Sequence, residues 1–144
     1  MAYLLDTNHC IYLMNGWNNP KDKLSHQERN TVAAFSKIGN DVIYMCEASI
    51  GELVYGVERS KRKEYNLRKL KSLLLAVPPI PVTRSVWDIY GQTKAQLVKV
   101  GKIMPDIDLL ISSAVKYNDL VLVGNDKHMN NLPESFIREN WAGV

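Results

Sequence analysis

The sequence predicts an α/β fold in which a parallel sheet is covered by helices on both faces. Segments of strand character alternate with segments of helical periodicity along the chain, an order that is typical of a parallel sheet. Residues 2–5 and 119–123 are apolar almost throughout, which indicates strands buried on both faces. At 144 residues, the chain can bury a core without disulfides or structural zinc, so we expect one domain over residues 1–144.

The first half of the chain contains two predicted strands and four predicted helices, separated mainly by glycine, asparagine and proline. In order, these are a strand at 2–6, a helix at 7–15 that ends at Asn15–Gly16, a polar helix from Pro20 to about Ile38 that ends at Gly39–Asn40, a strand at 41–46, an amphipathic helix at 48–60 and a strongly basic helix to about Val77.

The second half contains two predicted helices and further extended segments, with capping residues at the helix ends. In order, these are an extended piece at 78–82, a helix from Val86 to Val100 that Ser85 caps and Gly101 ends, a helix from Pro105–Asp106 through Tyr117, a strand at 119–123 and, after turns at Asn125–Asp126 and Pro133, an extended piece around 136–137.

The composition is that of an ordinary soluble globular protein, with 46% hydrophobic and 23% charged residues. A net charge of +3 and a pI near 8.8 permit a polyanionic partner without requiring one. Cys10 and Cys46 fit no metal-ligand spacing, and free thiols are a simpler expectation than one disulfide. The start of the chain lacks a basic leader and the run at 73–80 is too short to span a bilayer. We therefore expect a cytoplasmic protein without a membrane association.

Four acidic residues are placed where they could converge. Asp6 ends the first strand, Asp126 follows the strand at 119–123, Glu52 lies opposite the apolar stripe of its helix, and Asp108 opens a helix that is apolar all round. The carboxyl ends of parallel strands meet at one edge of a sheet, where open α/β folds bind their ligands. Clustered carboxylates repel one another unless a hard cation lies between them. The pattern predicts a Mg²⁺ or Mn²⁺ site and phosphodiester chemistry.

Each acid also has a purely structural interpretation. Asp6 is a good N-cap for the following helix, a role that is compatible with metal binding. Glu52 could be a solvated surface residue, although the small residues around it would leave space above its carboxylate. Asp106 and Asp108 both stand at a helix start, and Asp106 is the more natural cap. Asp126 lies in a turn composition that needs no function.

Four segments together resemble the PIN-domain family and, within it, the VapC-type toxins of bacterial toxin–antitoxin pairs. The resemblance covers nearly the whole chain in order and spacing, and the segments that carry it are residues 4–8, 49–56, 108–114 and 122–126. It implies a three-layer α/β/α sandwich around a parallel sheet. It also implies a divalent-metal-dependent endoribonuclease that forms a homodimer and is neutralised by a separately encoded antitoxin.

Carried over by position, the resemblance makes Asp6, Glu52, Asp108 and Asp126 the acidic quartet. Asp6 and Asp108 would then ligate one Mg²⁺ or Mn²⁺ directly, while the other two acids bind through water or hold a second ion. The hydroxyl of Thr7 and the amide of Asn8 stand at the same strand exit, suited to holding a carboxylate or a metal-bound water.

The chain departs from the family pattern at two positions. Gly124 stands where the family often has threonine, and Met129 stands where it usually has phenylalanine. The first change removes a hydroxyl near Asp126 and weakens its support, so Asn125 could share that role.

A dense basic stretch follows Glu52 along the chain. It is either a solvated helix face or a phosphate track that brings RNA to an otherwise repulsive acidic site. The candidate RNA-backbone residues are Arg59, Lys61, Arg62, Lys63, Arg68 and Lys69.

Other functions remain open on sequence alone. A structure-specific DNA nuclease would use similar acids, but at this length the chain has no room for elements that grip a duplex. A receiver-like signalling domain would need paired acids after the first strand, where only Asp6 stands. A degenerate member could bind its antitoxin without cutting. His9 and His128 have no zinc spacing and are expected to be surface or packing residues.

Overall fold

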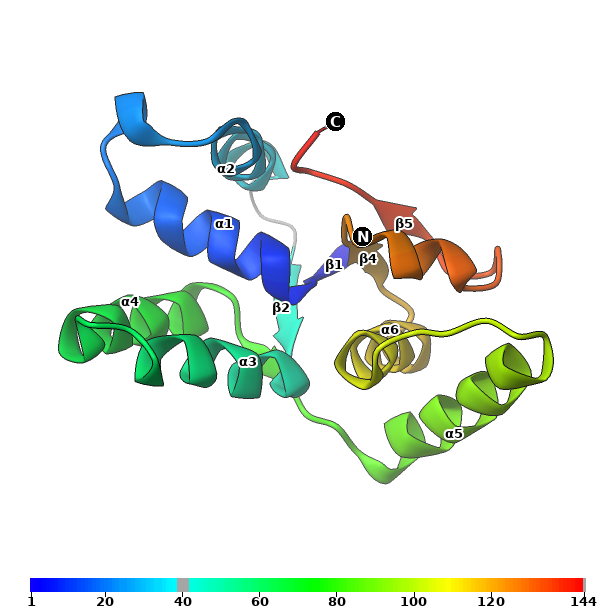
Figure 1. The fold of residues 1–144 in the computed structure, drawn as a ribbon. Helices are drawn as coiled ribbons and strands as arrows, with labels where there is room; N and C mark the ends of the chain where they lie inside the picture. The colour runs from blue at the N-terminus through cyan, green and yellow to red at the C-terminus, as the bar shows by residue number, and fades with distance from the viewer. Residues whose placement is uncertain (39–41, 144) are drawn as a thin grey trace.

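The structure, a computed structural model, describes residues 1–38 and 42–143. A five-stranded sheet with the order β3-β2-β1-β4-β5 forms its centre, and every strand pair is parallel. The predicted fold class, a parallel sheet between two helical layers, is confirmed (Figure 1). The strands are β1 (Ala2–Leu5), β2 (Val42–Cys46), β3 (Pro79–Ile80), β4 (Val121–Val123) and β5 (Arg138–Glu139).

The helices divide between the two faces of the sheet. The first four pack around one buried cluster and the last two around another, as Figure 1 shows on opposite sides of β1 and β4. None of the helices in the described part of the chain is long and apolar enough to cross a membrane. The helices are α1 (Thr7–Asn18), α2 (His26–Ile38), α3 (Glu47–Glu58), α4 (Lys63–Ala76), α5 (Arg84–Lys99) and α6 (Asp106–Asn118), with 3₁₀ turns at Lys21–Lys23 and Lys127–Asn131.

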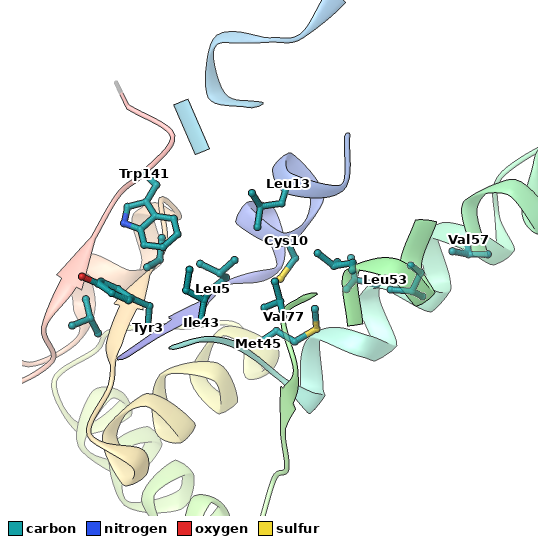
Figure 2. Close-up of a cluster of buried hydrophobic side chains, with 14 residues drawn as sticks. Tyr3, Leu5, Cys10, Leu13, Ile43, Met45, Leu53, Val57, Val77 and Trp141 are labelled. Carbon is teal, nitrogen blue, oxygen red and sulfur yellow. The ribbon is translucent and has the colours of Figure 1, made fainter. Parts of the chain in front are cut away.

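The central strands supply both cores because their side chains alternate between the two faces. Tyr3 and Leu5 of β1 join the cluster beneath α1, whereas Leu4 joins the cluster beneath α6. Figure 2 shows the first cluster, with Leu5 beside Ile43 and Tyr3 beside Trp141. This burial on both faces is what the continuous apolar strands predict.

The sequence predicts that the first helix ends at Asn15–Gly16, but α1 continues through Gly16 to Asn18. A Cβ at Gly16 would overlap Cγ2 of Val32 on α2. The glycine therefore serves the close packing of two helices, and the favourable burial between them outweighs its low helix propensity.

Several element boundaries also differ from those predicted. Helix α2 begins at His26 rather than Pro20, after a capping box in which Ser25 and Glu28 exchange bonds of 2.8 and 3.1 Å. Thr83, not Ser85, caps α5, because its side chain accepts a hydrogen bond from the backbone N–H of Val86.

The remaining differences are small. The last strand lies two residues later than the extended piece expected at 136–137. The predicted helix end at 39–40 and the strand start at 41 lie outside the described residues. Cys10 and Cys46 are free, as expected. Both are buried, and burial raises the pKa of both thiols.

Candidate active site

Asp6 stands at the exit of β1 and begins the site. Its Oδ1 accepts a hydrogen bond of 2.8 Å from the backbone N–H of His9, so it is the N-cap of α1. Its own N–H donates to the carbonyl of Val123, 2.8 Å away, which fixes it to the neighbouring strand β4. Only 2% of Asp6 is exposed. The capping role expected for Asp6 is confirmed, and it leaves Oδ2 for another partner.

His9 provides a second contact to the same carboxylate oxygen. Its ring Nδ1 lies 2.8 Å from Asp6 Oδ1, and its Nε2 accepts a bond of 3.3 Å from the backbone N–H of Trp141. The imidazole is fully buried. The sequence alone predicts a surface or packing role for His9 and not this contact with Asp6. The signal that could indicate the contact is the position of His9 three residues after an N-cap aspartate.

Glu52 is brought to the exit of β1 by a pair of hydroxyl groups. The Thr7 hydroxyl donates to Glu52 Oε1 over 2.5 Å, and its oxygen lies 3.0 Å from that of Ser49, which is buried. The expectation that Thr7 holds a carboxylate is confirmed. Small residues on this face of α3 leave the Glu52 side chain exposed and close to the strand exits.

Burial and the charges of the other three acids both act on Asp108. It lies in the first turn of α6 and is half-buried. Burial and the negative charges of Asp126, Glu52 and Asp6 raise its pKa to about 6, against an opposing effect of His128. The other three predicted acids, each from a different part of the fold, therefore lie near enough to act on Asp108.

Asp126 follows β4 and caps the 3₁₀ turn behind it. Its Oδ1 accepts a bond from the backbone N–H of His128 and lies 2.8 Å from the ring Nδ1 of the same residue. Partial burial opposes ionisation, but these two contacts prevail and lower the pKa of Asp126. The turn composition thus gives Asp126 a capping role, and one of its oxygens is held as in Asp6.

Amide side chains connect the exits of β1 and β4. Asn8 donates from Nδ2 to Asn125 Oδ1 over 3.3 Å, and Asn125 donates to the Tyr12 hydroxyl over 3.1 Å. These bonds hold the segment that carries Asp126 against α1. Both amides therefore brace the strand exits from positions next to the acids.

Asp106 is not the helix cap that the sequence predicts. The N-cap of α6 is Pro105, which makes no side-chain bond to the helix. Asp106 instead accepts bonds from the Tyr90 hydroxyl at 2.7 Å and from Lys94 Nζ at 2.8 Å. The bonds from Lys94 and Tyr90 lower the pKa of Asp106. Asp106 therefore connects α6 to α5 through Tyr90 and Lys94.

Gly124 and Met129, the two departures from the family pattern, are neighbours in space. A Cβ at Gly124 would overlap the sulfur of Met129 and lie 3.2 Å from Asp6 Oδ2. Met129 is 2% exposed and fills the volume that a side chain at Gly124 would need. The absence of a side chain at Gly124 therefore leaves room for Met129, and Asp6 Oδ2 lies against the exit of β4.

The candidate basic residues lie apart from the acids. Four of them surround the turn between α3 and α4, at the end of α3 that is far from the strand exits in Figure 1, and Arg68 and Lys69 lie farther along α4. Along α3, Arg59 is about 10 Å from Glu52, at 1.5 Å per residue. Lys63 lies 3.3 Å from Glu58, and the Arg62 guanidinium lies 4.0 Å from the Tyr65 ring centre. Such exposed cations can contact a polyanionic ligand that extends beyond the acidic site.

The donor chemistry of the site fits a hard divalent cation. Within residues 1–38 and 42–143, no three His, Cys, Asp or Glu side chains are gathered as a ready-made metal-binding group. The four acids nevertheless offer carboxylate oxygens only, which are the ligands that Mg²⁺ and Mn²⁺ prefer. A cation would also relieve the repulsion that raises the pKa of Asp108.

Comparison with known proteins places this geometry in a family. The model of the PIN domain matches residues 3–135. Ribonuclease VapC2 of Rickettsia felis is 33% identical over 142 residues, covering 98% of both chains. The tRNA(fMet)-specific endonuclease VapC of Shigella flexneri is 22% identical over 142 residues and 99% of both chains.

A solved structure agrees with these relatives. The crystal structure of VapBC2 from Rickettsia felis, bound to a DNA fragment from its promoter, contains a chain with a TM-score of 0.80 and 32% identity. The match covers 98% of this chain and 99% of that one. The chain therefore belongs to the PIN-domain family, and its relatives within that family are VapC proteins.

Proposed function

We propose that this protein is a divalent-metal-dependent endoribonuclease and the toxin of a toxin–antitoxin pair. The observation that carries the proposal is the convergence of Asp6, Glu52 and Asp126 around Asp108: hydrogen bonds hold these three carboxylates at the strand exits, and their charges, with burial, raise the pKa of Asp108. The relatives named as VapC ribonucleases support RNA as the substrate.

The four acids would hold the metal at the strand exits. Asp6 and Asp108 would bind one ion directly, and Glu52 and Asp126 would bind through water or hold a second ion. A bound Mg²⁺ or Mn²⁺ supplies an activated water and neutralises charge that develops on the phosphate. The chain's own contribution is orientation, because Thr7 holds Glu52 and the backbone of His9 holds Asp6.

A metal-dependence assay on the Asp6→Asn variant tests this assignment. The variant should lose cleavage by at least about 100-fold, since a ligand that contributes several kcal/mol is removed. The matched control is Asp22→Asn, which changes an exposed aspartate in the 3₁₀ turn before α2. Transfer, ribosomal and messenger RNA are incubated with Mg²⁺, with Mn²⁺ and with EDTA. Cleavage that persists in EDTA or in Asp6→Asn would refute the proposed chemistry.

The kind of nucleic acid that is cut, DNA or RNA, distinguishes the main alternative enzyme from the proposed one. A structure-specific DNA nuclease would cut a flap or branched duplex faster than RNA, whereas we expect cleavage of RNA only. A degenerate or signalling domain would cut neither substrate in any metal.

The basic turn between α3 and α4 would contact the RNA backbone. Replacing Lys61, Arg62 and Lys63 with glutamine should weaken RNA binding and reduce the slope of log K against log salt by about 2, as expected for three lost phosphate contacts on a single strand. A control variant removes three lysines elsewhere on the exposed surface, namely Lys21, Lys23 and Lys99. An unchanged slope in the first variant would exclude the turn as a phosphate track.

The same proposal includes a protein partner and a cellular place. The solved VapBC2 structure supports a separately encoded antitoxin as the partner, and we expect a homodimer of this chain within that complex. Action on cellular RNA requires the cytoplasm. Co-expression with the neighbouring open reading frame should yield a stable complex in which cleavage is suppressed.

A further inference from the structure

The His9 side chain is completely buried at the site, and both of its ring nitrogens have a partner. Nδ1 lies 2.8 Å from Asp6 Oδ1 and Nε2 lies 3.3 Å from the backbone nitrogen of Trp141. Because the Trp141 N–H is a donor, Nε2 must present its lone pair. The ring proton is then on Nδ1, and His9 donates it to Asp6.

This bond determines which way the Asp6 carboxylate faces. Oδ1 receives both the backbone N–H and the ring N–H of His9. Oδ2 is left on the other side, against Gly124 at the exit of β4. The same use of one oxygen occurs at Asp126, where the backbone and ring nitrogens of His128 both approach Oδ1 at 2.8 Å. Each carboxylate thus uses one oxygen, Oδ1, for contacts within the fold.

The C-terminal segment in turn holds His9. Trp141 is 7% exposed and packs on Tyr3 with ring centres 5.3 Å apart (Figure 2). Asn30 on α2 donates to the carbonyl of Ala142 over 3.0 Å, and Gly124 donates to that of Glu139 over 3.0 Å. The backbone N–H that orients His9 is therefore in a well-packed segment, separated from it by 132 positions.

We propose that His9 is a positioning residue that turns Asp6 Oδ2 toward the metal and that takes its own orientation from the backbone of Trp141. The inference deepens the proposed function and depends on it. A histidine that orients a metal-binding carboxylate acts as the outer contacts of metal sites generally do, and their loss weakens metal binding by about 10- to 100-fold.

Two substitutions separate the two contacts of His9. In His9→Asn, the amide nitrogen can take the place of Nδ1 and donate to Asp6, but nothing accepts from Trp141. In His9→Gln, the amide oxygen can take the place of Nε2 and accept from Trp141, but Asp6 Oδ1 loses its side-chain donor. The control is His26→Asn, which changes an exposed histidine at the start of α2.

Mn²⁺ affinity, measured by calorimetry or electron paramagnetic resonance without RNA, should distinguish the variants. We expect the Mn²⁺ dissociation constant of His9→Gln to rise by about 10-fold or more, and that of His9→Asn to stay within about threefold of the parent. Thermal unfolding should show the opposite order, with the larger loss in His9→Asn. Equal affinity of His9→Gln and the parent, or equal losses in both variants, would overturn the inference.

A metal-free measurement keeps this test independent of the proposed function. Nitrogen-15 spectra of the imidazole rings should show His9 as the Nδ1–H tautomer, and an Nε2–H tautomer would overturn the inference whether or not Mn²⁺ binds. Failure of the unaltered protein to bind Mn²⁺ would instead refute the proposed metal-dependent nuclease.

Discussion

Replacing Asp108 with asparagine should stabilise the metal-free protein and at the same time abolish its response to Mn²⁺. The pKa of Asp108 is raised to about 6 by burial and by three neighbouring acids. Ionisation of this carboxyl at neutral pH therefore costs folding free energy. Asparagine has nearly the same shape and carries no charge, so it removes that cost.

The magnitude follows from the difference between a pKa of about 6 and the ordinary value of 3.8. That difference corresponds to about 3 kcal/mol for a fully shielded group. Because Asp108 is only half-buried, solvent screening reduces it to about 1–1.5 kcal/mol. Loss of an anion at the start of α6 offsets about 0.5 kcal/mol. We expect a net gain of about 1 kcal/mol, or about 2–4 °C in Tm.

The pH dependence has a definite sign. In the unfolded chain the carboxyl loses its proton near pH 4, whereas the folded protein keeps it until about pH 6. Stability of the parent therefore falls as pH rises through this window and stays reduced above it. The advantage of Asp108→Asn should be near zero at pH 4 and complete at pH 7.5.

Urea and thermal unfolding in EDTA at these two pH values give the measurement. Adding Mn²⁺ at 100 times its dissociation constant should stabilise the parent by about 2.7 kcal/mol and leave the variant unchanged, so the order of stability reverses. The control is Asp106→Asn on the same helical turn. Its pKa is lowered by Lys94 and Tyr90, so this substitution should reduce stability and preserve the Mn²⁺ response.

Two results would refute the reasoning about Asp108. One is a variant that is less stable than the parent in EDTA at pH 7.5. The other is a difference in stability that is the same at both pH values, because an electrostatic origin requires it to grow as the carboxyl ionises.

Three further substitutions test the packing of Gly16 between α1 and α2, the packing of Gly124 against Met129, and the hydroxyl contact of Thr7. Gly16→Ala should destabilise the fold by about 1–3 kcal/mol in urea unfolding, because its Cβ overlaps Val32, and Val32→Ala should restore part of the loss. Gly124→Ala should displace Met129, lower stability by a similar amount and weaken Mn²⁺ binding through Asp6 Oδ2; normal binding would contradict this. Thr7→Val should reduce kcat/KM about 10-fold, because the Glu52 carboxylate loses its hydroxyl donor, whereas Thr7→Ser should keep the activity.

The sequence predicts the parts of the fold that depend on local pattern. Continuous apolar runs identified β1 and β4 because strands of a parallel sheet are buried on both faces. The same logic located Asp6 and Asp126, since a carboxylate after such a strand has to lie at the sheet edge. The positions of Glu52 and Asp108 are less direct to predict, because they depend on which face or end of a helix the apolar residues indicate.

The errors arise where a distant residue outweighs a local preference. Gly16 favours a helix end by propensity, but packing against α2 uses it inside α1. Asp106 favours capping, but Lys94 and Tyr90 on α5 offer it stronger charged and neutral donors. The role of His9 depends on a backbone group at the other end of the chain. No local window contains these partners.

Burial and the distribution of hydrogen bonds together explain why the pKa of Asp108 is raised. Asp6, Glu52 and Asp126 each accept a bond from a nearby side chain or backbone group. The Asp108 side chain accepts none among the described residues. Burial and the charges of the other three acids therefore act on a carboxyl whose charged form no hydrogen bond stabilises, and they raise its pKa to about 6. A cation bound among these acids would oppose that shift, so the charge of Asp108 would depend on metal binding.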